Sequence, residues 1–177
     1  MKKTRLSMIA LASTFLMTGC SSVGTVTSGT DNPCGTLKSI VADYPSGFDA
    51  YRGTGSSYKM VTIYRAKEQL IRGHCEIWAW GTGDSAYTCT VGAPNRDVSD
   101  ALYSKAAGQL AQCLGPDWSV ENAARERDGK PAGEISRFRN TAQGSPVVSL
   151  HRVEDNARQS VYLYIGSARR SPLKATE

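Results

Sequence analysis

The sequence is poor in the residues that catalytic and metal sites use most. It contains only two histidines, His74 and His151, and neither stands in a recognisable catalytic or metal-binding pattern. No CxxC pair is present, which argues against both a zinc site and a redox-active dithiol. We therefore expect no metal ion and no cofactor.

Enzyme motifs are also absent. Gly83-Asp84-Ser85 contains residue types of a hydrolase serine motif, but it follows no long apolar strand, and turn formation explains it better. The glycine-rich residues 53–57 lack the lysine of a phosphate-binding loop. Carboxylates such as Glu76 and Glu134 have no distinguishing context. We expect this protein not to be an enzyme.

Long apolar runs are missing after the first residues of the chain. The one uncharged apolar run, Leu6 to Met17, follows a cationic start formed by Lys2, Lys3 and Arg5. It is too short to span the roughly 30 Å hydrocarbon core of a bilayer, which needs about 20 residues. A cationic start, a short apolar run and small residues after it are the layout of a secretion signal.

The apolar run ends in Gly19-Cys20, which resembles the lipobox of bacterial lipoproteins, with Met17 at a position where leucine is commonest. In that family the signal, here residues 1–19, is cut before the cysteine, which is acylated on its sulfur and on its new amino group. Ser21 after the cysteine resembles a sorting signal for the outer membrane. Three acyl chains would hold the protein there almost permanently, since each buried methylene adds roughly 0.8 kcal/mol. The alternative is an ordinary cleaved signal with an incidental cysteine.

An excess of positive charge is absent from the mature chain. The formal net charge of +5 comes from 21 basic and 16 acidic residues, and removal of the three basic residues of the leader leaves +2. A surface of this mixed kind argues against a nucleic-acid partner. The expected membrane attachment is therefore the lipid on Cys20 alone.

Four segments are expected along the chain. Residues 1–19 form the signal, and residues 20–31 are small and polar, which predicts a flexible tether with a reach of roughly 20 Å. Residues 32–166 are enough for a single domain. Residues 167–177 contain Arg169, Arg170 and Lys174 with little apolar content, and we expect a loose basic tail.

Four cysteines remain in the mature domain: Cys34, Cys75, Cys89 and Cys113. An even number in an exported chain predicts two disulfides. A three-residue turn at Gly81-Thr82-Gly83 would place Cys75 opposite Cys89 and leave Cys34 for Cys113. A four-residue turn that includes Asp84 would separate them onto opposite faces, so both pairings stay open.

The apolar pattern predicts two helices. The first starts at Asn32-Pro33, with the proline in its first turn, and stops at Pro45. The second is capped by Asp97 or Ser99 and ends before Gly115-Pro116. Strands are expected at 60–64, 74–80, 87–91, 135–139, 147–153 and 161–165, whereas 120–127 is ambiguous with a short helix. The fold expected is α+β, with an antiparallel sheet of about five to six strands and two helices on one face. Its order is helix, strands, helix, strands, and an internal duplication is an open possibility.

Aromatic residues form the candidate binding surface. Trp78 and Trp80 share one side of a strand, and Tyr162 and Tyr164 share one side of another. Aromatic residues with polar tips are enriched at binding surfaces, and three arginines could flank them: Arg137, Arg139 and Arg152. The alternative, in which the tryptophans point into the core, stays open.

These features favour a non-catalytic lipoprotein of the outer membrane, facing the periplasm, that binds a protein or peptidoglycan partner in the cell envelope. The alternative function is an inhibitor or immunity lipoprotein that neutralises a toxin or a cell-wall hydrolase.

Replacement of Cys20 tests the lipid anchor. We expect Cys20→Ser to leave the chain unprocessed or to release it from membranes, because the acyl chains have no other attachment point. Membrane fractionation and mass spectrometry of the amino terminus measure this. An unchanged membrane fraction would contradict it.

Overall fold

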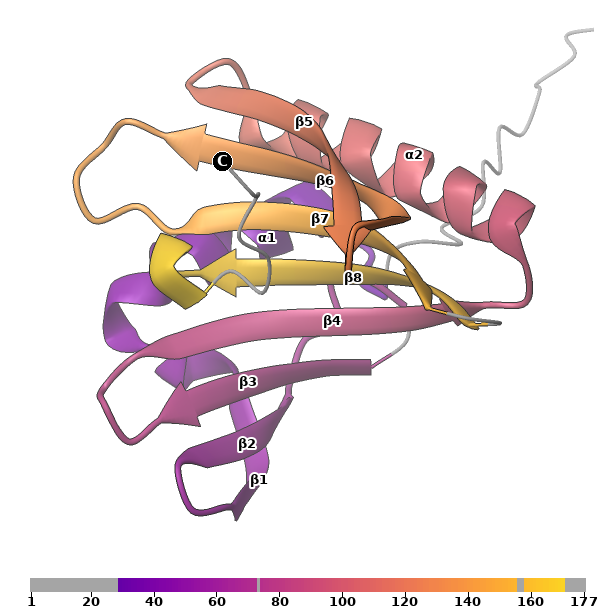
Figure 1. Ribbon diagram of the computed structural model, residues 1–177. Helices are drawn as coiled ribbons and strands as arrows, with labels where there is room; N and C mark the ends of the chain where they lie inside the picture. The colour runs from indigo at the N-terminus through magenta and orange to yellow at the C-terminus, as the bar shows by residue number, and fades with distance from the viewer. Residues whose placement is uncertain (1–28, 73, 156–157, 171–177) are drawn as a thin grey trace, which may run out of the picture.

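The computed structural model describes residues 29–72, 74–155 and 158–170. Over these residues the protein is α+β, with two α-helices and an antiparallel sheet of eight strands (Figure 1). The α-helices are α1 (Pro33–Ala42) and α2 (Arg96–Leu114). The strands are β1 (Arg52–Ser57), β2 (Val61–Ala66), β3 (His74–Trp80), β4 (Ser85–Ala93), β5 (Trp118–Arg127), β6 (Lys130–Asn140), β7 (Val147–Asp155) and β8 (Arg158–Gly166).

The sheet consists of two four-stranded meanders joined in the middle. Its strand order is β1-β2-β3-β4-β8-β7-β6-β5, so that the last strand of each meander pairs with the other. One α-helix precedes each meander in the chain, and both helices lie behind the sheet in Figure 1. The element order differs from the expected one because it also contains three short 3-10 helices: η1 (Tyr44–Ser46), η2 (Asp49–Tyr51) and η3 (Ala168–Arg170).

Local sequence signals explain both α-helices. The side chain of Asn32 accepts a hydrogen bond from Gly35 N–H at the start of α1, and Pro33 occupies the first turn. The helix α2 begins two to four residues earlier than predicted, because Asn95 rather than Asp97 or Ser99 caps it and accepts from Val98 N–H at 2.9 Å.

The hydrophobic core lies between the helices and one face of the sheet. Leu37 and Ile40 of α1 and Leu110 of α2 pack against apolar residues of the central strands. A row across β3, β4, β8 and β7 shows this face: Cys75, Cys89, Leu163 and Leu150 are neighbours in register and all are at most 1 % exposed.

Two disulfides join the four cysteines of the domain. Cys34–Cys113 links the start of α1 to the end of α2, and Cys75–Cys89 joins β3 to β4. Ala79 pairs with Ser85, and Trp80 N–H donates to Asp84 C=O, so the turn has the three-residue register that places Cys75 opposite Cys89.

The expected count of five to six strands is wrong, because β1 and β5 form the two edges of the sheet. The sequence of β1 is rich in glycine and serine, and that of β5 is mostly polar or charged, so neither shows an apolar alternation. An edge strand is held by backbone pairing on one side and exposes much of its surface. It therefore does not need alternating apolar residues in its sequence. The short helix considered for 120–127 is also wrong, since this segment belongs to β5.

Among the described residues, no helix is long and apolar enough to cross a membrane. The signal, Cys20 and nearly all of the predicted tether lie outside the described residues. The predicted tail is described only to Arg170, where Ser167 and Arg170 both donate hydrogen bonds to the carboxylate of Asp84.

The hydroxyl group of Tyr87 fixes the connection between β2 and β3. This fully buried side chain donates to Glu68 C=O at 2.7 Å and accepts from Leu70 N–H at 3.1 Å. Leu70 and Ile71 are thereby held in the core, each 6 % exposed.

We expect Tyr87→Phe to lower the free energy of unfolding by about 1–3 kcal/mol, because it leaves a buried N–H and a carbonyl without their partner. Urea denaturation measures the change. Tyr58→Phe is the matched control, since it removes the same hydroxyl group from a tyrosine that is 63 % exposed. Equal stability of the two variants would contradict the role of this hydroxyl.

Candidate binding surface

The face of the sheet opposite the helices, here called the open face, carries the predicted aromatic residues. Ile77 pairs with Tyr87 on the helix side, so its neighbours Trp78 and Trp80 point to the open face. Val161, Leu163 and Ile165 face the helices in the same way, which places Tyr162 and Tyr164 on the open face. The structure therefore brings all four aromatic residues of the candidate surface to one side.

A polar row crosses the open face beside the aromatic residues. In register from β2 to β5 its members are Arg65, Glu76, Thr88, Tyr164, Ser149, Arg137 and Glu121. The next row contains His74, Thr90, Tyr162, His151, Ile135 and Ala123. An acidic residue thus lies on the β3 side of the tyrosines, and arginine lies on the β6 side.

The two tryptophans are held in fixed positions. Trp78 Nε1 donates to Glu76 Oε2 at 2.8 Å, and His74 Nε2 lies 2.7 Å from the other oxygen of this carboxylate. Trp80 contacts Trp78 edge to face, and the Arg170 guanidinium lies 4.3 Å from the centre of the Trp80 ring. Both tryptophans remain half-buried, so part of each ring is accessible.

The two tyrosines differ in exposure. Tyr162 is half-buried, and burial together with Glu76 raises its pKa to about 12, although a hydrogen bond with Thr88 opposes the shift. Tyr164 is only 2 % exposed, and its hydroxyl donates to Ser167 C=O. Tyr164 therefore supports Trp80 and Tyr162 from below, whereas Tyr162 presents part of its ring.

His151 lies buried at the centre of the open face. It is 1 % exposed, its Nε2 lies 3.0 Å from the hydroxyl of Ser149, and its ring contacts Tyr162 edge to face. Burial, with added repulsion from Arg125 and Arg137, lowers its pKa to about 3, so the ring is neutral. Its Nδ1 is buried without a hydrogen-bond partner.

The Ser149–His151 pair does not meet the geometry of a catalytic triad. A triad needs an acid on the second ring nitrogen, and the groups near His151 are arginines. Ser149 is also fully buried, so a substrate has no access to its hydroxyl. Within the described part of the chain, no three His, Cys, Asp or Glu side chains are grouped to hold a metal ion.

Two of the three predicted flanking arginines lie on the open face. Glu121 Oε1 lies 3.7 Å from Arg137 and its Oε2 lies 3.8 Å from Arg139. Arg137 is buried and Arg139 is exposed. Arg125 was missed by the sequence analysis, and it leans over the same face, where it donates to Ala132 C=O.

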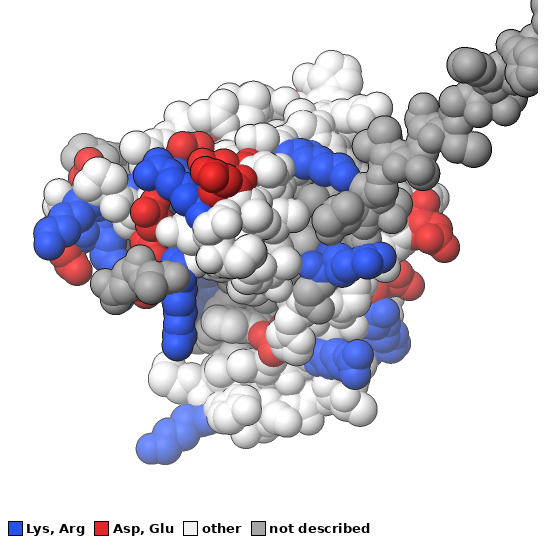
Figure 2. Space-filling model, turned by 90° about the vertical axis from the view of Figure 1, so that its right-hand side faces the viewer, with Lys and Arg blue, Asp and Glu red and all other residues white. Residues whose placement is uncertain are grey.

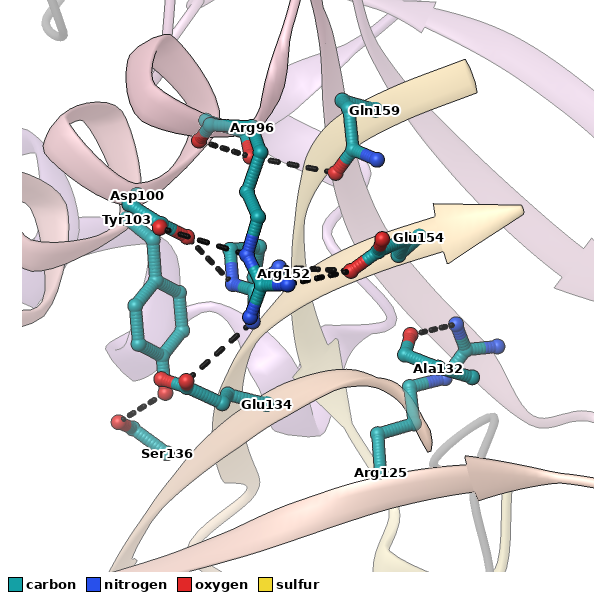
Figure 3. Close-up of polar contacts among 11 residues, drawn as sticks. Arg96, Asp100, Tyr103, Arg125, Ala132, Glu134, Ser136, Arg152, Glu154 and Gln159 are labelled. Carbon is teal, nitrogen blue, oxygen red and sulfur yellow. Dashed lines mark hydrogen bonds and ion pairs between the residues drawn. The ribbon is translucent and has the colours of Figure 1, made fainter. Parts of the chain in front are cut away.

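The expectation that Arg152 flanks the aromatic residues is wrong, because Arg152 points to the helix side. Its side chain is 3 % exposed and lies among three carboxylates: Asp100 at 2.8 Å, Glu134 at 3.2 Å and Glu154 at 3.3 Å (Figure 3). Burial lowers the pKa of Arg152, but these carboxylates outweigh burial and raise it. The cluster ties α2 to β6 and β7.

Further ion pairs extend this cluster toward the surface. Arg96 lies 3.8 Å from Asp100 and 3.9 Å from Glu154, and nearby Tyr103 shares a hydrogen bond with Ser136. Figure 2 views the side on which the β5–β6 and β7–β8 hairpins turn, and positive and negative side chains interleave over its upper part. Alternating charges of this kind stabilise contacts between elements, so we interpret the cluster as structural.

The buried polar residues had no usable signal in the sequence. Ser149 and His151 alternate with Val148 and Leu150, a pattern typical of a strand with one exposed face. Both faces of β7 are buried, and a pattern on a single strand does not report what covers the polar side. Arg152 continues the apolar side, which the pattern alone does not identify.

Comparison of the chain with protein-family models, curated proteins and solved structures found no match.

The buried His151 predicts a pH dependence of stability. Between a pKa of about 3 in the folded state and about 6.5 in the unfolded state, only the unfolded chain binds a proton at this ring. The free energy of unfolding therefore falls as the pH falls below about 7. We expect the wild type to lose roughly 2 kcal/mol more than His151→Gln between pH 7 and pH 5.

Urea denaturation at several pH values measures this difference. The same pH dependence in His151→Gln and the wild type would contradict the burial of a neutral histidine.

Proposed function

We propose that this protein is a lipid-anchored outer-membrane lipoprotein that binds a protein or peptidoglycan partner in the cell envelope through its open face. The observation that carries the proposal is the position of Trp78, Trp80 and Tyr162, which lie half-buried on the face that the helices leave uncovered. The leader with Cys20 supports the location.

The rigidity of this aromatic surface favours binding. Glu76 orients the indole of Trp78, and Arg170 packs on Trp80 while Asp84 holds the guanidinium at 2.8 Å. Side chains that are already ordered lose little conformational entropy when a partner binds, so more of the contact energy remains as affinity. Large rings with few torsions suit this purpose.

Charge adds selectivity to the surface. Glu76 lies on the β3 side of Tyr162 and Tyr164, and the exposed Arg139 lies on the β6 side. A partner with the opposite order of charges would align across the sheet in one orientation. A binding role is favoured over a hydrolytic one because Ser149 is buried and the second nitrogen of His151 has no acidic partner.

Crosslinking in intact cells tests this function. The chain, expressed with its leader, is treated with a reversible crosslinker and recovered, and the captured material is compared between variants. We expect one stoichiometric partner with the wild type, and at least tenfold less with Trp78→Ala/Trp80→Ala, because loss of two central aromatic residues removes several kcal/mol of contact energy. Recovery of glycan fragments in place of a protein would assign the partner to peptidoglycan.

A second variant separates binding from folding. Thr90 is exposed in the same row as Tyr162, so Thr90→Arg blocks the open face without removal of a packed ring. The matched control is Tyr58→Ala/Met60→Ala, whose side chains are 63 % and 76 % exposed in the turn between β1 and β2. Unchanged capture by folded Thr90→Arg, or equal loss in the control, would overturn the proposal.

A further inference from the structure

The outer edge of β5 has no neighbouring strand among the described residues. β5 is the last strand of the sheet, and eight of its ten residues pair regularly with β6 before a register shift at Arg125/Glu126. An edge of this length presents unpaired backbone N–H and C=O groups, which a further strand can pair. Natural edge strands often carry charged side chains that oppose such pairing. The positions of these charges therefore decide which strand can pair with the edge, and in which register.

The surface beside this edge is only partly covered. A groove of about 520 Å³ runs between α2 and the strands β5 and β6, and its walls include Tyr103, Ala107 and Ala124. Val120 points to the same side and is 52 % exposed. An added strand at the edge would close the open side of this groove.

The charges of β5 are self-complementary. Glu121 and Arg125 stand two residues on either side of Ala123 and point to the same face. If two copies of β5 paired antiparallel with Ala123 at the dyad, each Glu121 would oppose Arg125 of the other copy. A dyad at Glu121 or at Arg125 would instead place like charges opposite one another, which destabilises a pair.

Arg125 is suited to such a partner. The described residues give it a hydrogen bond to Ala132 C=O but no ion pair, and its Nε is buried without a hydrogen-bond partner. Burial and, after it, repulsion from Arg127 lower its pKa and outweigh the attraction of Asp155, so a carboxylate of a second copy would stabilise its charge further. Arg127 already pairs with Asp155 at 2.9 Å, which disfavours a register that would use Arg127 in place of Arg125. The contacts of Glu121 within its own chain are longer, at 3.7 Å from Arg137 and 3.8 Å from Arg139, so this carboxylate can also accept Arg125 of a second copy.

We propose that two copies of this chain associate through β5, antiparallel about Ala123, so that each Glu121 pairs with Arg125 of the second copy and the two sheets become continuous. A small side chain at the dyad allows the two strands to approach, and the neighbouring Asn122 and Ala124 meet across the axis on the helix side. The Glu121–Arg125 pairs lie at the β5 edge of the open face, whereas Trp78, Trp80 and Tyr162 lie on β3 and β8 and stay accessible in both copies. This association therefore does not depend on the proposed function.

Engineered cysteines test the register. We expect Ala123→Cys in the detergent-solubilised full chain to form a disulfide-linked dimer when a mild added oxidant takes up the two electrons of the paired thiols, because these thiols would lie directly opposite one another on one face. Asn122→Cys is the matched control, since its counterpart is Ala124 and not itself, and it should give less than a tenth as much dimer on non-reducing electrophoresis. The wild type shows how much covalent dimer the native cysteines form without an introduced cysteine.

Charge reversal tests the interaction. We expect Glu121→Arg to raise the dissociation constant of the dimer about tenfold, since two attractive pairs become repulsive. Glu121→Arg/Arg125→Glu should restore it, and circular dichroism checks that each variant folds. Analytical ultracentrifugation of the detergent-solubilised full chain measures association. A monomeric wild type, equal crosslinking at positions 122 and 123, or failure of the double reversal to restore the dimer would overturn the proposal.

Discussion

Because α1 and α2 cover only one face of the sheet, the two faces of each central strand meet different physical requirements. On the helix side, the strands must present apolar side chains that pack against the helices. One row of such residues consists of Cys75, Cys89, Leu163 and Leu150. The open face has no helix to cover it, so its own long side chains cover the backbone. Rings and guanidinium groups serve this purpose because one part packs while another part reaches water or a hydrogen-bond partner.

The two neighbouring residues His151 and Arg152 show how differently a buried basic group can be accommodated. Arg152 keeps its charge, because Asp100, Glu134 and Glu154 surround it and replace the water that it loses. His151 faces Arg125 and Arg137 on the other side of the sheet and gives up its charge instead. The result is a charged clamp between α2 and the sheet on one face, and a neutral, aromatic centre on the other.

Sequence reasoning was most successful where the signal is local. Asn32-Pro33 starts α1 and Gly115 ends α2, because capping groups act within one turn. It failed at β1 and β5, where strand formation depends on pairing with β2 and β6 rather than on the apolar content of the segment itself. The position of Arg152 was missed for a related reason, since its three carboxylate partners come from α2, β6 and the end of β7.

By itself, the sequence determined that the domain is α+β, that it has four cysteines able to form two disulfides, and that Trp78 and Trp80 share a side, as do Tyr162 and Tyr164. Only the tertiary structure decided that these two pairs share one face, that this face is the one without helices, and that Tyr164 and His151 are buried within it. The physical reason is that periodicity along a strand reports which residues point the same way. Whether those residues point toward the helices or toward the open face depends on the strand order and on where the helices pack. Both are set by contacts between residues far apart in the chain.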